Sequence, residues 1–81
     1  MTILVLDGDL LGEALEQLAD DELLIVVEPS ADRLEELERE FPDSRITFLI
    51  GDGVVIPVPD GSVDKVLGDG SESERRRVLR G

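Results

Sequence analysis

The chain has 81 residues, 41% of them hydrophobic and 2% aromatic, which is enough for one small domain with a limited core. Its formal net charge of −12 repels nucleic-acid phosphates and anionic lipids, which argues against direct binding of either. It contains neither cysteine nor histidine, which excludes disulfide bonds, thiolate metal sites and histidine-based catalysis.

The longest apolar run, residues 23–27, is far too short to cross a bilayer, and the amino terminus lacks the basic segment of a signal peptide. We therefore expect a cytoplasmic protein with no membrane association. The acid-rich composition, with Lys65 as the single lysine, is also typical of adaptation to high salt or to heat. On that interpretation the charge reflects habitat more than function.

A strand and a helix are predicted first. Residues 3–6 are wholly apolar and are followed by Asp-Gly, as in a buried strand. Leucine and alanine then recur at helical spacing over residues 11–19, and Asp9 could cap this helix.

A second strand and helix follow the same pattern. Residues 23–27 form an apolar, β-branched-rich run closed by Glu28 and Pro29. Ser30 can cap the next helix, and Pro42 would end it. The predicted apolar face of this helix consists of Ala31, Leu34, Leu37 and Phe41.

The last third of the chain is less regular. Residues 45–50 predict a third strand, whereas two prolines in and after residues 54–58 favour an extended loop. Residues 63–67 could form a fourth short strand. Ser71 or Ser73 could cap a final helix that runs to the end of the chain.

Apolar strands separated by helices indicate a parallel sheet that is covered on both faces. With right-handed crossovers, this order predicts a small three-layer Rossmann-like α/β fold. We expect about four strands in the order 3-2-1-4, helices on both faces, and a single domain over residues 1–81.

In such a sheet, ligands bind at the carboxyl ends of the strands near the switch in strand order. Acidic or glycine residues follow all three of the first strands: Asp7, Gly8 and Asp9, then Glu28, then Asp52 between two glycines. Glu28 lies about twenty residues beyond the first turn, where an acid often accepts the hydroxyls of a ribose. A solvated acid that merely ends a strand would give the same pattern.

Residues 46–68, ITFLIGDGVVIPVPDGSVDKVLG, resemble the third and fourth strands of class I S-adenosylmethionine-dependent methyltransferases. The similarity lies in the Gly-Asp-Gly at 51–53, the Ile-Pro at 56–57 and the Pro-Asp-Gly-Ser-Val-Asp at 59–64. Weaker similarities lie around Glu28 and in the Arg-Val-Leu-Arg-Gly at the end of the chain.

The resemblance implies S-adenosylmethionine as the cofactor. Asp52 and Gly53 would contact the adenine, and Glu28, followed by Pro29, would hold the ribose. The methionine end would meet the first loop, whose candidate residues are Asp7, Gly8, Asp9 and Gly12.

The first loop departs from the family pattern Asp-x-Gly-x-Gly-x-Gly, because Asp9 and Leu11 stand near positions of glycine. The chain also stops where the family would begin its fifth strand. We therefore expect a partial module, incomplete or inactive alone, that takes its methyl acceptor and any catalytic residue from elsewhere.

Other protein classes share the opening loop. Its Asp-x-Asp resembles haloacid-dehalogenase-type phosphatases, but leucines follow where those enzymes have a hydroxyl residue. It also resembles receiver domains, in which Asp52 would be the phospho-acceptor and Asp7 and Asp9 would help to hold magnesium. A non-catalytic interaction or regulatory protein of the same fold is a further alternative.

The predicted fourth strand would be an open edge of the sheet. Open edges invite pairing with another chain, so we expect a homodimer or a partner protein at that edge.

Overall fold

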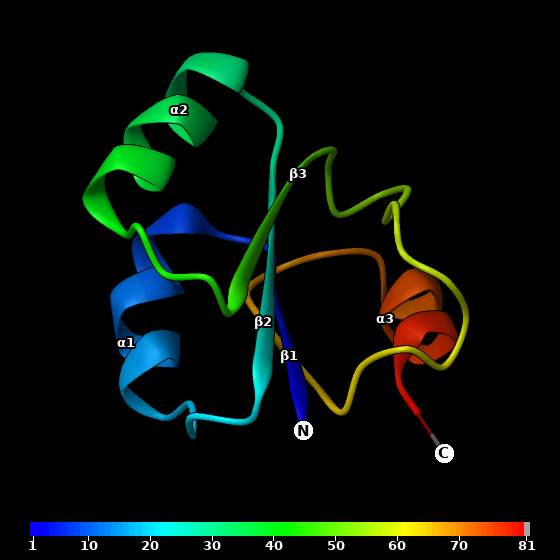
Figure 1. Ribbon diagram of the computed structural model, residues 1–81. Helices are drawn as coiled ribbons and strands as arrows, with labels where there is room; N and C mark the ends of the chain where they lie inside the picture. Colours follow the sequence, from blue (N-terminus) through cyan, green and yellow to red (C-terminus); the bar gives the residue numbers. More distant parts are fainter. Residues whose placement is uncertain (81) are drawn as a thin grey trace.

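A computed structural model describes residues 1–80 of the chain (Figure 1). Within these residues no helix is long and apolar enough to cross a membrane. The strands and helices follow one another in the predicted order, and a 3-10 turn precedes the first helix. The elements are β1 (Thr2–Val5), η1 (Gly8–Leu10), α1 (Leu11–Glu16), β2 (Leu23–Glu28), α2 (Ala31–Glu40), β3 (Ile46–Ile50), β4 (Lys65–Leu67) and α3 (Glu72–Val78).

The four strands form one parallel sheet in the order β3-β2-β1-β4, which confirms the predicted fold class and strand order. Helices α1 and α2 lie on one face of the sheet, and α3 lies on the other (Figure 1). The chain between β3 and β4 has no long regular element and crosses the α3 side, as the prolines in this stretch predicted.

Two hydrophobic cores result, one on each face of the sheet. Alternate residues of β1 point to opposite faces, so Ile3 and Val5 join the first core and Leu4 the second. This explains why residues 3–5 of β1 and residues 23–27 of β2 are all apolar. Other members of the first core are Leu11, Ala14, Leu18, Leu24, Val26, Leu37 and Ile46; those of the second are Val27, Ile56, Val58, Val63, Val66 and Val78.

Helix α2 matches its sequence prediction closely. The Ser30 hydroxyl accepts a hydrogen bond from the Arg33 N–H at 3.3 Å and so caps the helix. Of the predicted apolar face, Leu34 and Leu37 are buried, Phe41 is half-buried, and Ala31 is exposed in the first turn; the helix ends at Glu40.

Helix α1 differs from its prediction at both ends. Asp9 does not cap it: Asp7 caps the preceding 3-10 turn, and Leu10 stands at the α1 cap position without a side-chain hydrogen bond. The helix ends at Glu16 because the next turn tightens, with the Leu18 N–H donating to the Leu15 carbonyl at 3.2 Å.

The end of the described chain also corrects the predicted boundaries. Helix α3 stops at Val78, and β4 begins only at Lys65. Val63, two residues before β4, instead pairs in parallel with Leu79. The Val63 N–H donates to the Val78 carbonyl at 3.0 Å, and the Arg80 N–H donates to the Val63 carbonyl at 2.7 Å. The chain leaves α3 because the residues after it are held beside Val63; the predicted helix end at Gly81 lies outside the described residues.

Candidate functional site at the carboxyl edge of the sheet

The loop after β1 is shaped by Asp7 and Gly8. The Asp7 carboxylate accepts a hydrogen bond from the Asp9 N–H at 3.0 Å, which starts the 3-10 turn. Gly8 is buried, and a Cβ atom on it would lie 2.9 Å from Leu37 Cδ1. A side chain at this position would therefore require the Leu37 side chain of α2 to move.

Glu28 lies beside this loop, at the end of β2. The point where a Gly8 Cβ would stand is 3.5 Å from Glu28 Oε2, so the structure brings these two predicted residues together. The other carboxylate oxygen, Oε1, accepts a hydrogen bond from the Ser30 N–H at 3.3 Å. Pro29 is exposed and connects β2 to the cap of α2. Glu28 is thus held on one oxygen, and its other oxygen faces the first loop.

Asp9 and Gly12 do not join this pair. The Asp9 carboxylate forms an ion pair with Arg33 of α2 at 3.2 Å. Gly12 is the second residue of α1, and a Cβ on it would meet the ring of Phe41 at 3.7 Å. Both residues therefore contribute to the packing of the two helices rather than to the edge of the sheet.

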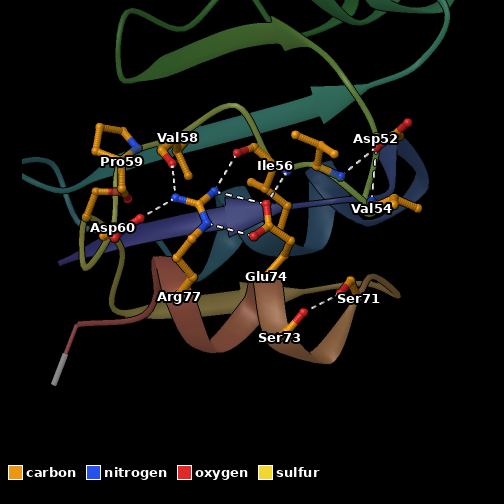
Figure 2. A network of polar contacts seen from close by, with 12 residues as sticks. Asp52, Val54, Ile56, Val58, Pro59, Asp60, Ser71, Ser73, Glu74 and Arg77 are labelled. Atoms are coloured by element: carbon orange, nitrogen blue, oxygen red, sulfur yellow. Dashed lines mark hydrogen bonds and ion pairs between the residues drawn. The ribbon is translucent and has the colours of Figure 1, made fainter.

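Asp52 organises the loop after β3. Its Oδ1 atom accepts hydrogen bonds from the N–H groups of Val54 at 3.0 Å and Val55 at 2.9 Å (Figure 2). The carboxylate thereby turns the chain away from β3 and towards the α3 face. The sequence favours a ligand contact for Asp52 over the role of a turn acid, and the structure shows that the turn role occupies one of its two oxygens.

The loops after β3 and β4 touch each other directly. A Cβ on Gly53 would lie 2.8 Å from Gly70 Cα and 3.0 Å from the Asp69 carbonyl oxygen. The Ser71 N–H donates to the Gly53 carbonyl at 2.7 Å. Only glycine permits this approach of two backbones.

The same β4 loop also rests on the end of β1. Gly68 has a φ of +98°, and a Cβ on Gly70 would lie 2.7 Å from Leu6 Cδ1. The switch in strand order lies between β1 and β4, where an α/β sheet ordinarily opens to a ligand. Here the loops after β3 and β4 meet over this point, and no pocket is found within residues 1–80.

The carboxylates of this edge do not gather into a metal site. In the described part of the chain, no group of three or more acidic side chains is placed to hold a metal ion. Asp7 and Asp9 each have a local partner, the Asp9 N–H and Arg33 respectively. The acidic triad required by the receiver-like alternative is therefore not assembled.

A network that the sequence did not predict lies on the α3 side of the sheet. Arg77 donates hydrogen bonds to both oxygens of Glu74, with Nε to Oε2 at 2.7 Å and Nη2 to Oε1 at 3.1 Å (Figure 2). It also donates to the Ile56 carbonyl at 2.7 Å, to the Val58 carbonyl at 2.9 Å and to Asp60 at 2.6 Å. Arg77 thus fastens the chain between β3 and β4 onto α3.

Glu74 completes this network by accepting a hydrogen bond from the Ile56 N–H at 2.9 Å. The hydrogen bond from Arg77, together with that backbone bond, lowers the pKa of Glu74. The same contacts with Glu74 and Asp60 raise the pKa of Arg77. The one signal of this pair in the sequence is the spacing of Glu74 and Arg77, because residues three apart lie side by side on a helix.

Comparison of the chain with protein-family models, with curated protein sequences and with solved structures gave no match in any of the three.

Proposed function

We propose that the carboxyl edge of the sheet binds S-adenosylmethionine through its adenosine part, as a methyltransferase-like module that is incomplete or inactive alone. The observation that carries this proposal is the proximity of Gly8 and Glu28, which lie at the carboxyl ends of neighbouring parallel strands beside the switch in strand order. A carboxylate in this place is suited to the two hydroxyl donors of a ribose.

The free carboxylate oxygens support this assignment. Glu28 Oε2 and Asp52 Oδ2 accept no hydrogen bond from residues 1–80, while the second oxygen of each side chain is held by backbone N–H groups. Glu28 would hold the ribose, and Asp52 with Gly53 would contact the adenine amino group and ring. The methionine end would lie along Asp7 and Gly8, and no catalytic residue is assigned.

Binding would require the loops after β3 and β4 to separate. The ligand would have to displace the contact between Gly53 and Gly70, which lies over the end of β1. A ligand stabilises an open state only by the difference in its affinity for the two states, so weak binding is expected. A partner that held the loops apart would increase the affinity.

Calorimetric titration with S-adenosylmethionine, S-adenosylhomocysteine and adenosine tests the proposal. We expect binding of all three and, for Glu28→Gln, at least about tenfold weaker binding, because a hydrogen bond to a charged group is lost. Glu40→Gln, at the opposite end of α2, is the matched control and should bind as the wild type does. No heat at millimolar ligand would refute the cofactor proposal.

A second candidate is a non-catalytic interaction protein that has this fold. It is favoured by the direct contact between Gly53 and Gly70 and by the exposure of apolar side chains just after β3. The receiver-like alternative is tested by incubation with magnesium and a phospho-donor. Phosphorylation of Asp52, detected by mass spectrometry, would support that alternative and count against the other two.

A further inference from the structure

The two edges of the sheet differ in how well they are covered. Strands β4 and β3 are both edge strands, each paired with a single neighbour. Beside β4, Leu79 and Arg80 already pair with Val63 at the entry to the strand. Strand β3 has no such neighbour within residues 1–80. Both edges are therefore open: β3 along its whole length, and the predicted fourth strand only along Lys65–Leu67.

The outward-facing backbone groups of β3 follow from its ladder with β2. The first hydrogen bond between the two strands runs from the Leu24 N–H to the Arg45 carbonyl at 2.9 Å. The last runs from the Gly51 N–H to the Glu28 carbonyl at 3.1 Å. Successive residues of a parallel strand alternate between its two neighbours. Phe48 and Ile50 therefore direct their N–H and C=O groups away from the sheet, where a further strand could pair with them.

The surroundings of this edge are apolar on one side. Strand β3 contains no charged residue, and Leu49 packs against the second core on the α3 side. Ile50 is 59% exposed and shares the α2 side with Ile46 and Phe48, because alternate residues of a strand point to the same face. Val54 and Val55, each 70% exposed, follow on the way to the α3 face, where Ile56 enters the second core. An open strand edge with exposed apolar side chains near the end of the strand is typical of a protein-binding surface.

The other side of the edge is acidic. Arg33 contacts Asp9, which places that flank of α2 towards η1 and α1. Glu38 lies about 140° around the helix from Arg33 and so faces the flank above β3. Glu38 is exposed and forms no ion pair within residues 1–80, whereas Glu35 on the same flank is paired with Arg39 at 3.6 Å. The net charge of −12 adds a long-range attraction for cations.

We infer that the outer edge of β3 binds an extended segment of a partner protein in which basic and apolar residues alternate. The backbone of this segment would pair with Phe48 and Ile50. Because successive side chains of a strand point to opposite faces, its basic residues would meet Glu38 on the α2 face. Its apolar residues would then lie on the α3 face of the sheet, beside Leu49.

A second copy of the chain fits this edge less well. Two β3 strands paired antiparallel would be related by a twofold axis perpendicular to the sheet, which places both α2 helices side by side on one face. The Glu38 carboxylates of the two copies would then face each other, and each chain carries a charge of −12. Charge complementarity therefore favours a basic partner.

The test uses an end-capped peptide of alternating lysine and valine, which is added to isotope-labelled protein and followed by NMR. We expect the amide signals of residues 47–50 to shift and those of β4 to remain, with affinity falling as salt is added. Two control peptides are the glutamate–valine analogue and one that groups the same lysines and valines in separate blocks. The proposal would be overturned if the peptide with grouped lysines and valines bound equally well, or if the signal shifts were spread over all acidic helices.

Two pairs of variants locate the site. Ile50→Pro removes an outward N–H and should weaken peptide binding at least about tenfold, while Ile50→Thr keeps the N–H and should bind nearly as the wild type does. Glu38→Lys should weaken binding about threefold to tenfold, whereas Glu16→Lys on α1 makes the same change in net charge and should not. Unchanged affinity in Glu38→Lys would refute the charge assignment. If sedimentation shows that the protein without peptide is a dimer, and Ile50→Pro abolishes this dimer, the edge is assigned to a second copy of the chain.

Discussion

Arg77 and Glu74, three residues apart on α3, form a two-pronged ion pair whose remaining hydrogen bonds hold the backbone at Ile56 and Val58. This pair connects the least regular part of the chain to the sheet. Ile56 and Val58 both belong to the second core, so the network also keeps the apolar side chains of this segment in place.

Loss of the Arg77 network should destabilise the protein. Arg77→Met leaves the Ile56 and Val58 carbonyls without their donor, and we expect the melting temperature to fall by more than about 5 °C. Arg76→Met is the control, because Arg76 is exposed and contacts only Glu72 on its own helix. Equal melting temperatures for the two variants would show that the network contributes nothing specific.

Acid should destabilise the protein through Asp43. Hydrogen bonds from Arg45 lower the pKa of Asp43 from 3.8 to about 2. A carboxylate with a lowered pKa stabilises the fold fully above its unfolded-state pKa, and this contribution is lost as the pH falls from about 4 to about 2. Urea unfolding across this range should show the midpoint falling with pH.

The variant Asp43→Asn tests the origin of this pH dependence. It should be less stable than the wild type at neutral pH, and its stability should decrease less than that of the wild type between about pH 4 and pH 2. Asp32→Asn removes an exposed carboxylate on α2 that does not contact Arg45, and it is expected to retain the wild-type profile. The proposal for Asp43 fails if both variants follow the same curve.

Two glycine-to-alanine changes should have opposite signs. Gly53→Ala would place a Cβ 2.8 Å from the Gly70 Cα, so the loops must separate at a cost of roughly 1–3 kcal/mol. In Gly12→Ala the new Cβ meets only the Phe41 ring at 3.7 Å, and the helix gains roughly 0.5–1 kcal/mol. Chemical denaturation measures both. A stable Gly53→Ala would show that the β3 and β4 loops do not depend on their direct contact.

Leu37 should be among the most costly positions to truncate. It is fully buried in the first core and touches Gly8, so it joins α2 to both the sheet and the first loop. Leu37→Ala should lower the free energy of unfolding by about 2–5 kcal/mol. Val55→Ala, at a side chain that is 70% exposed, should change stability by less than about 0.5 kcal/mol.

The sequence predicted the architecture well because its signals are local. Apolar runs marked the first three strands, and alternation with helices indicated a parallel sheet in the order that the structure shows. Ser30 was identified as a helix cap because capping depends on residues within one turn. The error at Asp9 arose where two acids lie one residue apart and either could cap: Asp7 does so, and Asp9 turns to Arg33.

Within the candidate site, the sequence placed Gly8, Glu28 and Asp52 at strand ends, and the structure shows that Gly8 and Glu28 are neighbours. It could not show that Gly12 packs against Phe41, because this contact depends on how two helices cross.

The sequence by itself thus determined the element types, the strand order and the position of acids and glycines at the carboxyl edge. Only the tertiary structure decided how these parts close on one another: the contact of Gly53 with Gly70 over the end of β1, the fastening of the central segment by Arg77, and the open edge at β3. Secondary structure follows from short-range periodicity, whereas these contacts join residues far apart in the chain, and their geometry exists only once both cores are packed.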